Sequence, residues 1–244
     1  MFISAIYNKG FVMESWFNIF SLVFTVSVRS FWIKKSFWIG IIIFALCLLI
    51  LFPFSLGTQV IKRPDVQIGC LWAIMEFVAA LCISRMFTTE QEANALDILL
   101  CSRSSRWAIL FAKICFTALL IFSLQIPILF FWMFFFNVDF FSITTFVLNL
   151  FFPSIFFSFG SAAIGAFVYG LTVRSLAKEI LQPILFFPLQ TALLLASVSI
   201  SLSANSLDSL SSAFGQQAWW TILVLYPVIF STLGWIFSFM LLEE

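Results

Sequence analysis

The sequence contains few side chains that could perform chemistry. It has no histidine, which excludes every site that needs an imidazole from this chain, including Ser-His-Asp or Cys-His catalysis, two-histidine zinc sites and histidine-ligated haem. The glycine spacing from Gly160 to Gly165 matches a P-loop, but Ala166 and Phe167 occupy the positions that need Lys and Ser or Thr. We therefore predict no catalytic, metal or nucleotide site.

The cysteines also give no indication of a redox or metal site. They form no C-x-x-C pair and stand mostly inside apolar runs, which is typical of small buried apolar side chains and not of a redox or metal site. The five are Cys47, Cys70, Cys82, Cys101 and Cys115.

Glu76 is the one carboxylate deep inside an apolar run. Ionisable residues within a membrane are costly and mark a pathway, a relay or a partner. No second acid stands at i+3 or i+4, which argues against a carboxylate dyad. Two interpretations stay open: a functional group, or a structural one that is protonated or paired with a neighbouring helix.

The longest polar segment on the predicted cytoplasmic side lies between the second and third apolar runs. It extends from Thr88 to Arg106 and reads TTEQEANALDILLCSRSSR. Acidic residues precede basic ones within it, which suits a helix dipole. It is either a short exposed helix that a cytoplasmic partner moves or an ordinary solvated loop. The candidate contact residues in and beside it are Arg85, Glu90, Glu92, Asp97, Leu99 and Leu100.

The amino-acid composition indicates the class of protein in which these residues lie. The chain has 244 residues, of which 63% are hydrophobic and 9% are charged, and its mean hydropathy is +1.13. Too few polar residues are present to coat a water-soluble domain. The formal net charge of +1 gives no electrostatic case for nucleic acid.

Six apolar runs are long enough to cross a bilayer. The sequence thus predicts an all-α integral membrane protein with one membrane domain over residues 1–244, made of an N-terminal extension with an interfacial helix (1–35) and a six-helix region (36–244). The runs are Phe37 to Leu56, Ile68 to Phe87, Ala108 to Phe136, Ile143 to Val173, Leu181 to Ser201 and Trp219 to Leu242.

The N-terminal stretch between Glu14 and Arg29 is uncharged but short for a span. Apolar residues recur there at steps of three and four, and polar ones lie off that stripe. This pattern favours an amphipathic helix in the membrane interface over a short seventh span. The stripe is Phe17, Phe20, Phe24, Val28 and Phe31, with Ser21, Thr25 and Arg29 beside it. Met13 is a second candidate start.

Basic residues predict the orientation. With both termini in the cytoplasm, ten basic residues fall on the cytoplasmic side and only Lys62 and Arg63 fall outside, as the positive-inside rule requires. Lys113 is then expected to reach the cytoplasmic interface by snorkelling. The other cytoplasmic ones are Lys9, Arg29, Lys34, Lys35, Arg85, Arg103, Arg106, Arg174 and Lys178.

Small residues and prolines mark packing within the spans. A stripe of small side chains in the fourth run lets helix backbones approach closely, while prolines permit kinks whose freed groups Gln125, Gln182 and Gln190 could satisfy. Trp219 and Trp220 read as aromatic belt residues at the outer interface, or as a surface for a flat macrocycle. The packing and kink residues are Pro127, Ser158, Ala162, Gly165, Ala166, Gly170, Pro183 and Pro188.

The order of several motifs resembles the CcmB family, the permease-like subunit of bacterial cytochrome c maturation, also called haem exporter protein B. Each motif is weak alone, but their order and spacing are specific, and they cover about residues 22 to 242. They are LFPFSLG (51–57), IGCLW (68–72), SRMF (84–87), EANALDILL (92–100), Lys113, Pro127, IGA (164–166), Leu171-Thr172 with Arg174, and Pro188-Leu189.

The resemblance implies an ABC-2-like permease of six spans in the bacterial inner membrane, without its own nucleotide site. A cytoplasmic CcmA-like ATPase would drive it through the Thr88 to Arg106 segment, beside a CcmC-like haem-handling subunit, a small CcmD-like subunit and a periplasmic CcmE-like haem chaperone. Haem would be cargo, exported or released on the loaded chaperone, and ATP would act through the partner. The alternatives are an ABC-2 exporter of lipid, polysaccharide or drug, an intramembrane enzyme, and a passive scaffold.

Overall fold

The computed structural model describes residues 16–33, 35–57, 60, 62–84, 106–136, 150–172, 177–203 and 210–241. Within them the long elements are all α-helices. In chain order they are α2 (Trp16–Ile33), α3 (Lys35–Leu56), α5 (Pro64–Ser84), α8 (Arg106–Phe136), α10 (Phe152–Thr172), α11 (Lys178–Ser203) and α12 (Leu210–Leu241).

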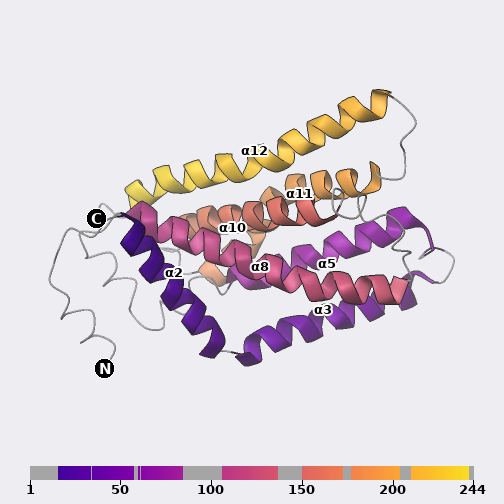
Figure 1. Ribbon diagram of the computed structural model, residues 1–244, viewed down its shortest axis with the longest axis horizontal. Coiled ribbons are helices and arrows are strands. Elements are labelled where there is room, and N and C mark those ends of the chain that lie inside the picture. The colour runs from indigo at the N-terminus through magenta and orange to yellow at the C-terminus, as the bar shows by residue number, and fades with distance from the viewer. Residues whose placement is uncertain are drawn as a thin grey trace.

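Six of these helices, α3, α5, α8, α10, α11 and α12, are long and apolar enough to cross a membrane, which confirms the predicted all-α fold. They lie side by side along the long axis of the molecule, and successive spans run in alternate directions (Figure 1). The start of α8 and the end of α12 meet at the same end of the bundle as α2. The protein is therefore a multi-pass membrane bundle.

The boundaries differ from the prediction where polar residues continue a helix. Helix α12 begins at Leu210, before the predicted sixth run, which starts at Trp219. The prediction was wrong there because hydropathy marks contact with lipid, whereas a helix continues wherever its backbone bonds are made. Helix α5 also begins early, at Pro64, with Asp65 in its first turn. Proline suits this position because the first N–H of a helix lacks a partner in any case.

The turn between α3 and α5 is built on a glycine. Gly57 has a φ of 78°, a left-handed conformation that side chains disfavour. Its N–H donates to the carbonyl of Pro53 at 3.2 Å, which ends α3 with a left-handed cap. Beyond it Arg63 donates to Asp65 in an exposed ion pair of 2.6 Å, and this hydrogen bond raises the pKa of Arg63 above its ordinary value.

Helix α10 lies at the centre of the bundle. Of its span, 61% is buried, against 17% for α3 and 22% for α12. Ser158, Ala162 and Ala166 are buried along it, and Gly170 is half-buried. A methyl group added at Gly165 would come within 2.5 Å of the Ile83 side chain on α5. Small residues therefore set how closely the neighbouring helices approach.

Helix α2 packs obliquely against the first turns of α8 (Figure 1). Val23 is buried with Ile109 and Ala112, and the ring of Phe20 lies 6.0 Å from that of Phe111. Ser21, Thr25 and Arg29 are on the exposed side of α2. The predicted amphipathic helix is confirmed, and it counts as a shorter apolar helix over Phe20–Arg29, apart from the six spans.

The packing of α10 predicts the effect of a single methyl group. We expect Gly165→Ala to lower the free energy of unfolding by on the order of 1 kcal/mol, because overpacking a rigid, β-branched neighbour outweighs the gain in helix propensity. The measurement is the midpoint of thermal unfolding in mild detergent. Gly40→Ala on α3 is the matched control, since a methyl group there meets nothing within 4 Å. Equal midpoints for the two variants would contradict the close approach.

Candidate functional site

The predicted contact residues Arg85, Glu90, Glu92, Asp97, Leu99 and Leu100 lie outside the described residues. The helices on either side of them are described. Helix α5 ends at Ser84 and α8 begins at Arg106, and these two ends lie toward the same end of the bundle (Figure 1). Helix α5 thus ends, and α8 begins, at the same end of the bundle.

Polar side chains from four helices are buried in the middle of the bundle. Glu76 is 7% exposed, and the other members are 0 or 1% exposed. We call this set the polar cluster. It consists of Glu76 on α5, Gln125 on α8, Ser158 and Ser161 on α10, and Gln190 on α11.

Two serines of α10 connect the polar cluster to its neighbours. Ser158 Oγ lies 3.1 Å from Gln125 Oε1 and 2.7 Å from the carbonyl oxygen of Ser154. Ser161 Oγ donates to the carbonyl of Phe157 at 2.7 Å and accepts a hydrogen bond from Gln190 Nε2. Serines at i and i+3 share one face of a helix, so α10 holds α8 and α11 through adjacent positions.

Glu76 contributes the only acid of the polar cluster. Within the described residues neither of its carboxyl oxygens has a hydrogen-bond partner, and the same is true of Gln125 Nε2 and Gln190 Oε1. The cluster is therefore buried with four hydrogen-bonding atoms still open.

Contacts on either side of the polar cluster show where it lies along the axis of the bundle. Toward the α5 start, Trp72 Nε1 donates to Ser201 Oγ of α11 at 2.9 Å, and the ring of Trp72 lies 5.1 Å from that of Phe157 on α10. Toward the other end, Gln182 Nε2 of α11 reaches the carbonyl of Ile83 at 3.5 Å. Glu76 lies between these two layers.

The glutamines were predicted to satisfy groups freed by prolines, and for Gln125 and Gln190 this was wrong. Their hydrogen bonds go to serine side chains of α10, because the glutamines face the bundle interior while Pro183 and Pro188 are exposed. Pro127, Pro183 and Pro188 stand within continuous helices. The signal for the polar cluster was available in the sequence as polar residues isolated within apolar runs.

The burial of two kinds of side chain, Lys113 and the cysteines, differs in part from what the sequence predicted. Lys113 is 4% exposed and is enclosed by protein, whereas snorkelling was expected. Of the cysteines that the structure describes, Cys70 and Cys82 are buried and Cys115 is half-buried, but Cys47 is exposed on α3. In the described part of the chain no three His, Cys, Asp or Glu residues gather to hold a metal ion.

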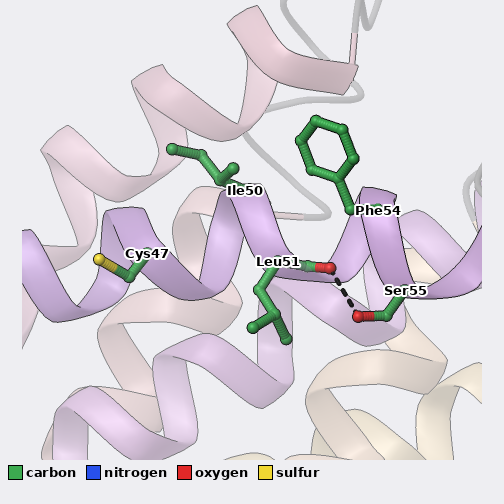
Figure 2. Close-up of a pocket in the computed structure, with 5 residues that line it drawn as sticks. All are labelled: Cys47, Ile50, Leu51, Phe54 and Ser55. Atoms are coloured by element: carbon green, nitrogen blue, oxygen red, sulfur yellow. Dashed lines mark hydrogen bonds between the residues drawn. The ribbon is translucent and has the colours of Figure 1, made fainter.

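The hollows on the outer helices are apolar. One on α3 is lined by Cys47, Ile50, Leu51, Phe54 and Ser55, and the Ser55 hydroxyl is turned to the carbonyl of Leu51 at 2.8 Å (Figure 2). Another on α12 includes Trp220 and Gln217. Trp219 and Trp220 are both half-buried, and the Trp220 ring packs edge-on against Phe156 at 6.5 Å. These surfaces suit lipid contact.

The family model described as CcmB protein matches residues 17–232, which is most of the chain. The chain belongs to the CcmB family. The family implies a haem-exporter ABC permease for cytochrome c maturation, so the CcmB chain is a permease subunit and not itself an enzyme. It works in an ABC-type complex with an ATPase and other Ccm subunits. No curated protein matches the sequence at a significant level.

The link from Trp72 to Ser201 provides a test of how this CcmB chain joins α5 to α11. In a double-mutant cycle of Trp72→Phe and Ser201→Ala, we expect a coupling energy of about 0.6 kcal/mol, since hydrogen bonds between membrane helices have roughly that value. Unfolding free energies in detergent supply the four corners. A cycle of Trp132→Phe with Ser201→Ala is the control and should give no coupling, because Trp132 Nε1 donates to the Gln67 carbonyl.

Proposed function

We propose that this CcmB protein is a single-domain permease through which a separate CcmA-like ATPase drives haem export, or release of a haem-loaded CcmE-like chaperone. The observation that carries the proposal is the family match over residues 17–232 on a bundle of six apolar helices. A CcmC-like subunit, which would bring the haem ligands, and a small CcmD-like subunit complete the complex. The histidine-free CcmB chain then moves its partners and does not ligate iron.

The proposed location is the bacterial inner membrane, with both termini in the cytoplasm. Lys35 and Lys178 begin α3 and α11, and Arg106 begins α8, so these three basic residues share the end at which α12 finishes. Lys62 and Arg63 lie in the turn at the opposite end. Basic residues favour the cytoplasmic side, which supports placing the 85–105 segment there.

The proposed coupling element is the segment from Thr88 to Arg106, with Glu90, Glu92 and Asp97 as its contact face toward the ATPase. Arg85, just before it, and Leu99 and Leu100 within it belong to the same proposed site. A push on this segment acts on both helices that flank it, α5 and α8. These two helices contribute Glu76 and Gln125 to the polar cluster, and Ile83 of α5 lies against Gly165 of α10. A displacement at the cytoplasmic end therefore reaches the centre of the bundle.

Helix α2 is a proposed brace in the membrane interface. Its buried face rests on the start of α8 through Val23, Ile109 and Ala112, and the ring of Phe24 lies 6.1 Å from that of Phe116. An amphipathic helix of this kind lies along the headgroup boundary. It would resist tilting of α8 while the coupling segment moves.

Charge reversal tests the coupling element directly. We expect Glu92→Lys with Asp97→Lys to reduce co-purification of the ATPase by roughly tenfold or more, because like charges at an interface are strongly unfavourable. Cytochrome c yield should fall with it. Asp65→Lys is the matched control, since this exposed acid lies at the other end of the bundle. Unchanged ATPase recovery in the double variant, at normal protein levels, would remove the coupling role.

Thiol labelling tests the orientation. In a variant whose native cysteines are replaced, Ala95→Cys should be protected from an impermeant reagent in intact cells and labelled after permeabilisation. Gln217→Cys, exposed near the start of the α12 span, should be labelled in both states and serves as the control. Labelling at position 95 in intact cells would place the segment on the wrong face for an ATPase.

A further inference from the structure

We propose that α12 is hinged at Pro227 and that the Tyr226 hydroxyl is the latch that holds the part of α12 before the hinge against α11. That part, residues 210–226, is called the α12 arm. The hinge does not rest on the proposed ATPase contact, since it is built only from the contacts of α12 with its neighbours.

Pro227 removes a backbone hydrogen bond in the middle of α12. It stands inside a continuous helix, where it has no N–H to donate to the carbonyl of Leu223 and its ring crowds that carbonyl. Helices bend sharply at such positions, and the helix opens on the side of the proline ring. The two parts of α12 are therefore joined by one backbone hydrogen bond fewer than an uninterrupted helix would have.

The hinge rests on a glycine of α10. Pro227 is buried, and a methyl group added at Gly160 would come within 3.3 Å of Pro227 Cγ. Because the ring side of the bend faces α10, the α12 arm leans outward, and its beginning, drawn in orange, stands away from α11 (Figure 1). Gly160 thus leaves room for the vertex of the bend.

The part of α12 after the hinge is held by two helices. The ring of Phe230, which is buried, lies 5.5 Å from that of Phe167 on α10. Gly234 is also buried, and a methyl group there would come within 3.9 Å of Leu110 on α8. This part is therefore the fixed side of the hinge.

The α12 arm is held close to the hinge and exposed at its far end. Among residues 217–226, whose side chains the structure describes, only Leu223 is buried. Toward the beginning of the arm Trp220 is half-buried, with its ring edge-on to that of Phe156 at 6.5 Å, and Gln217 is exposed. An arm held near its pivot is the side that swings.

Tyr226 fastens the α12 arm to α11. Its hydroxyl donates to the carbonyl of Leu189 at 3.1 Å, and a carbonyl oxygen has a second lone pair for this bond. The other hydroxyls of α12 whose side chains are described donate to carbonyls of their own helix; they are Thr221, Ser231 and Thr232. Single hydrogen bonds between membrane helices are modest in strength, so this latch can open and close.

The prolines of the other spans do not leave a free arm. Helix α11 is tied to α5 before and after its two prolines, through Gln182 and Ser201. On α8, Gln125 contacts α10 just before Pro127, and Trp132 donates to a carbonyl of α5 after it. The proline of α3 stands three residues from the end of that helix. Helix α12 is therefore the span in which a proline can act as a hinge.

Pulsed electron spin resonance tests the hinge on the purified full-length chain in mild detergent. In a variant whose native cysteines are replaced, spin labels at the exposed positions Gln217→Cys on the α12 arm and Phe134→Cys on α8 report where the arm lies. Tyr226→Phe removes only the hydroxyl, so it should broaden this distance distribution and shift it to longer values. Pro227→Ala restores the backbone hydrogen bond, so the shift caused by Tyr226→Phe should be absent from the double variant.

Thr221→Val is the matched control, because it removes a hydroxyl of the arm that binds its own helix, and it should leave the distribution unchanged. A second label pair beyond the hinge, Ile236→Cys with Ile39→Cys, should give the same distances in every variant. The proposal is overturned if Tyr226→Phe leaves the arm distance unchanged, if Thr221→Val or the second label pair shows the same shift, or if the shift persists in the Pro227→Ala background.

Discussion

The bundle depends on how closely its helices approach α10. Gly160 and Gly165 leave room for Leu193 of α11 and Ile83 of α5, each of which would come within 2.7 Å of an added methyl group. In lipid no hydrophobic force drives apolar helices together, so close van der Waals contact and interhelical hydrogen bonds must hold them. Small side chains allow the close van der Waals contact. They also make the interhelical hydrogen bonds possible, because they bring polar side chains of adjacent helices within reach.

The polar cluster is a consequence of that approach. Ser158 and Ser161 lie on the same helix as Gly160 and Gly165, so the surface that admits the neighbouring backbones also presents two hydroxyl groups to them. A buried network of this kind is stabilising only when every member is satisfied. The open atoms of Glu76, Gln125 and Gln190 are therefore best understood together, as one arrangement shared by three helices around α10.

Hydropathy was sufficient to predict the spans, because lipid imposes one length and one composition on every crossing helix. It could not give helix ends in water, which is why α12 was predicted to begin at Trp219 and begins at Leu210. Hydropathy also could not predict which side chains of neighbouring helices contact one another. The sequence singled out Glu76 and the small residues of α10, but which helix faces Gln125 or Gln190 depends on rotation about each helix axis, and uniformly apolar helices carry almost no periodic signal for that rotation.

The same contacts decide how movement can pass through the molecule. Helix α5 is tied to α11 on both sides of the polar cluster, by Trp72 with Ser201 and by Ile83 with Gln182, and a close-packed interior transmits displacement instead of absorbing it. Helices α3 and α12 expose most of their spans and have fewer constraints. A force applied at the end of α5 would therefore move α5, α10 and α11 as a unit against these outer helices. A rearrangement within that unit would first have to break the hydrogen bonds that join α11 to α5 and to Ser161 of α10.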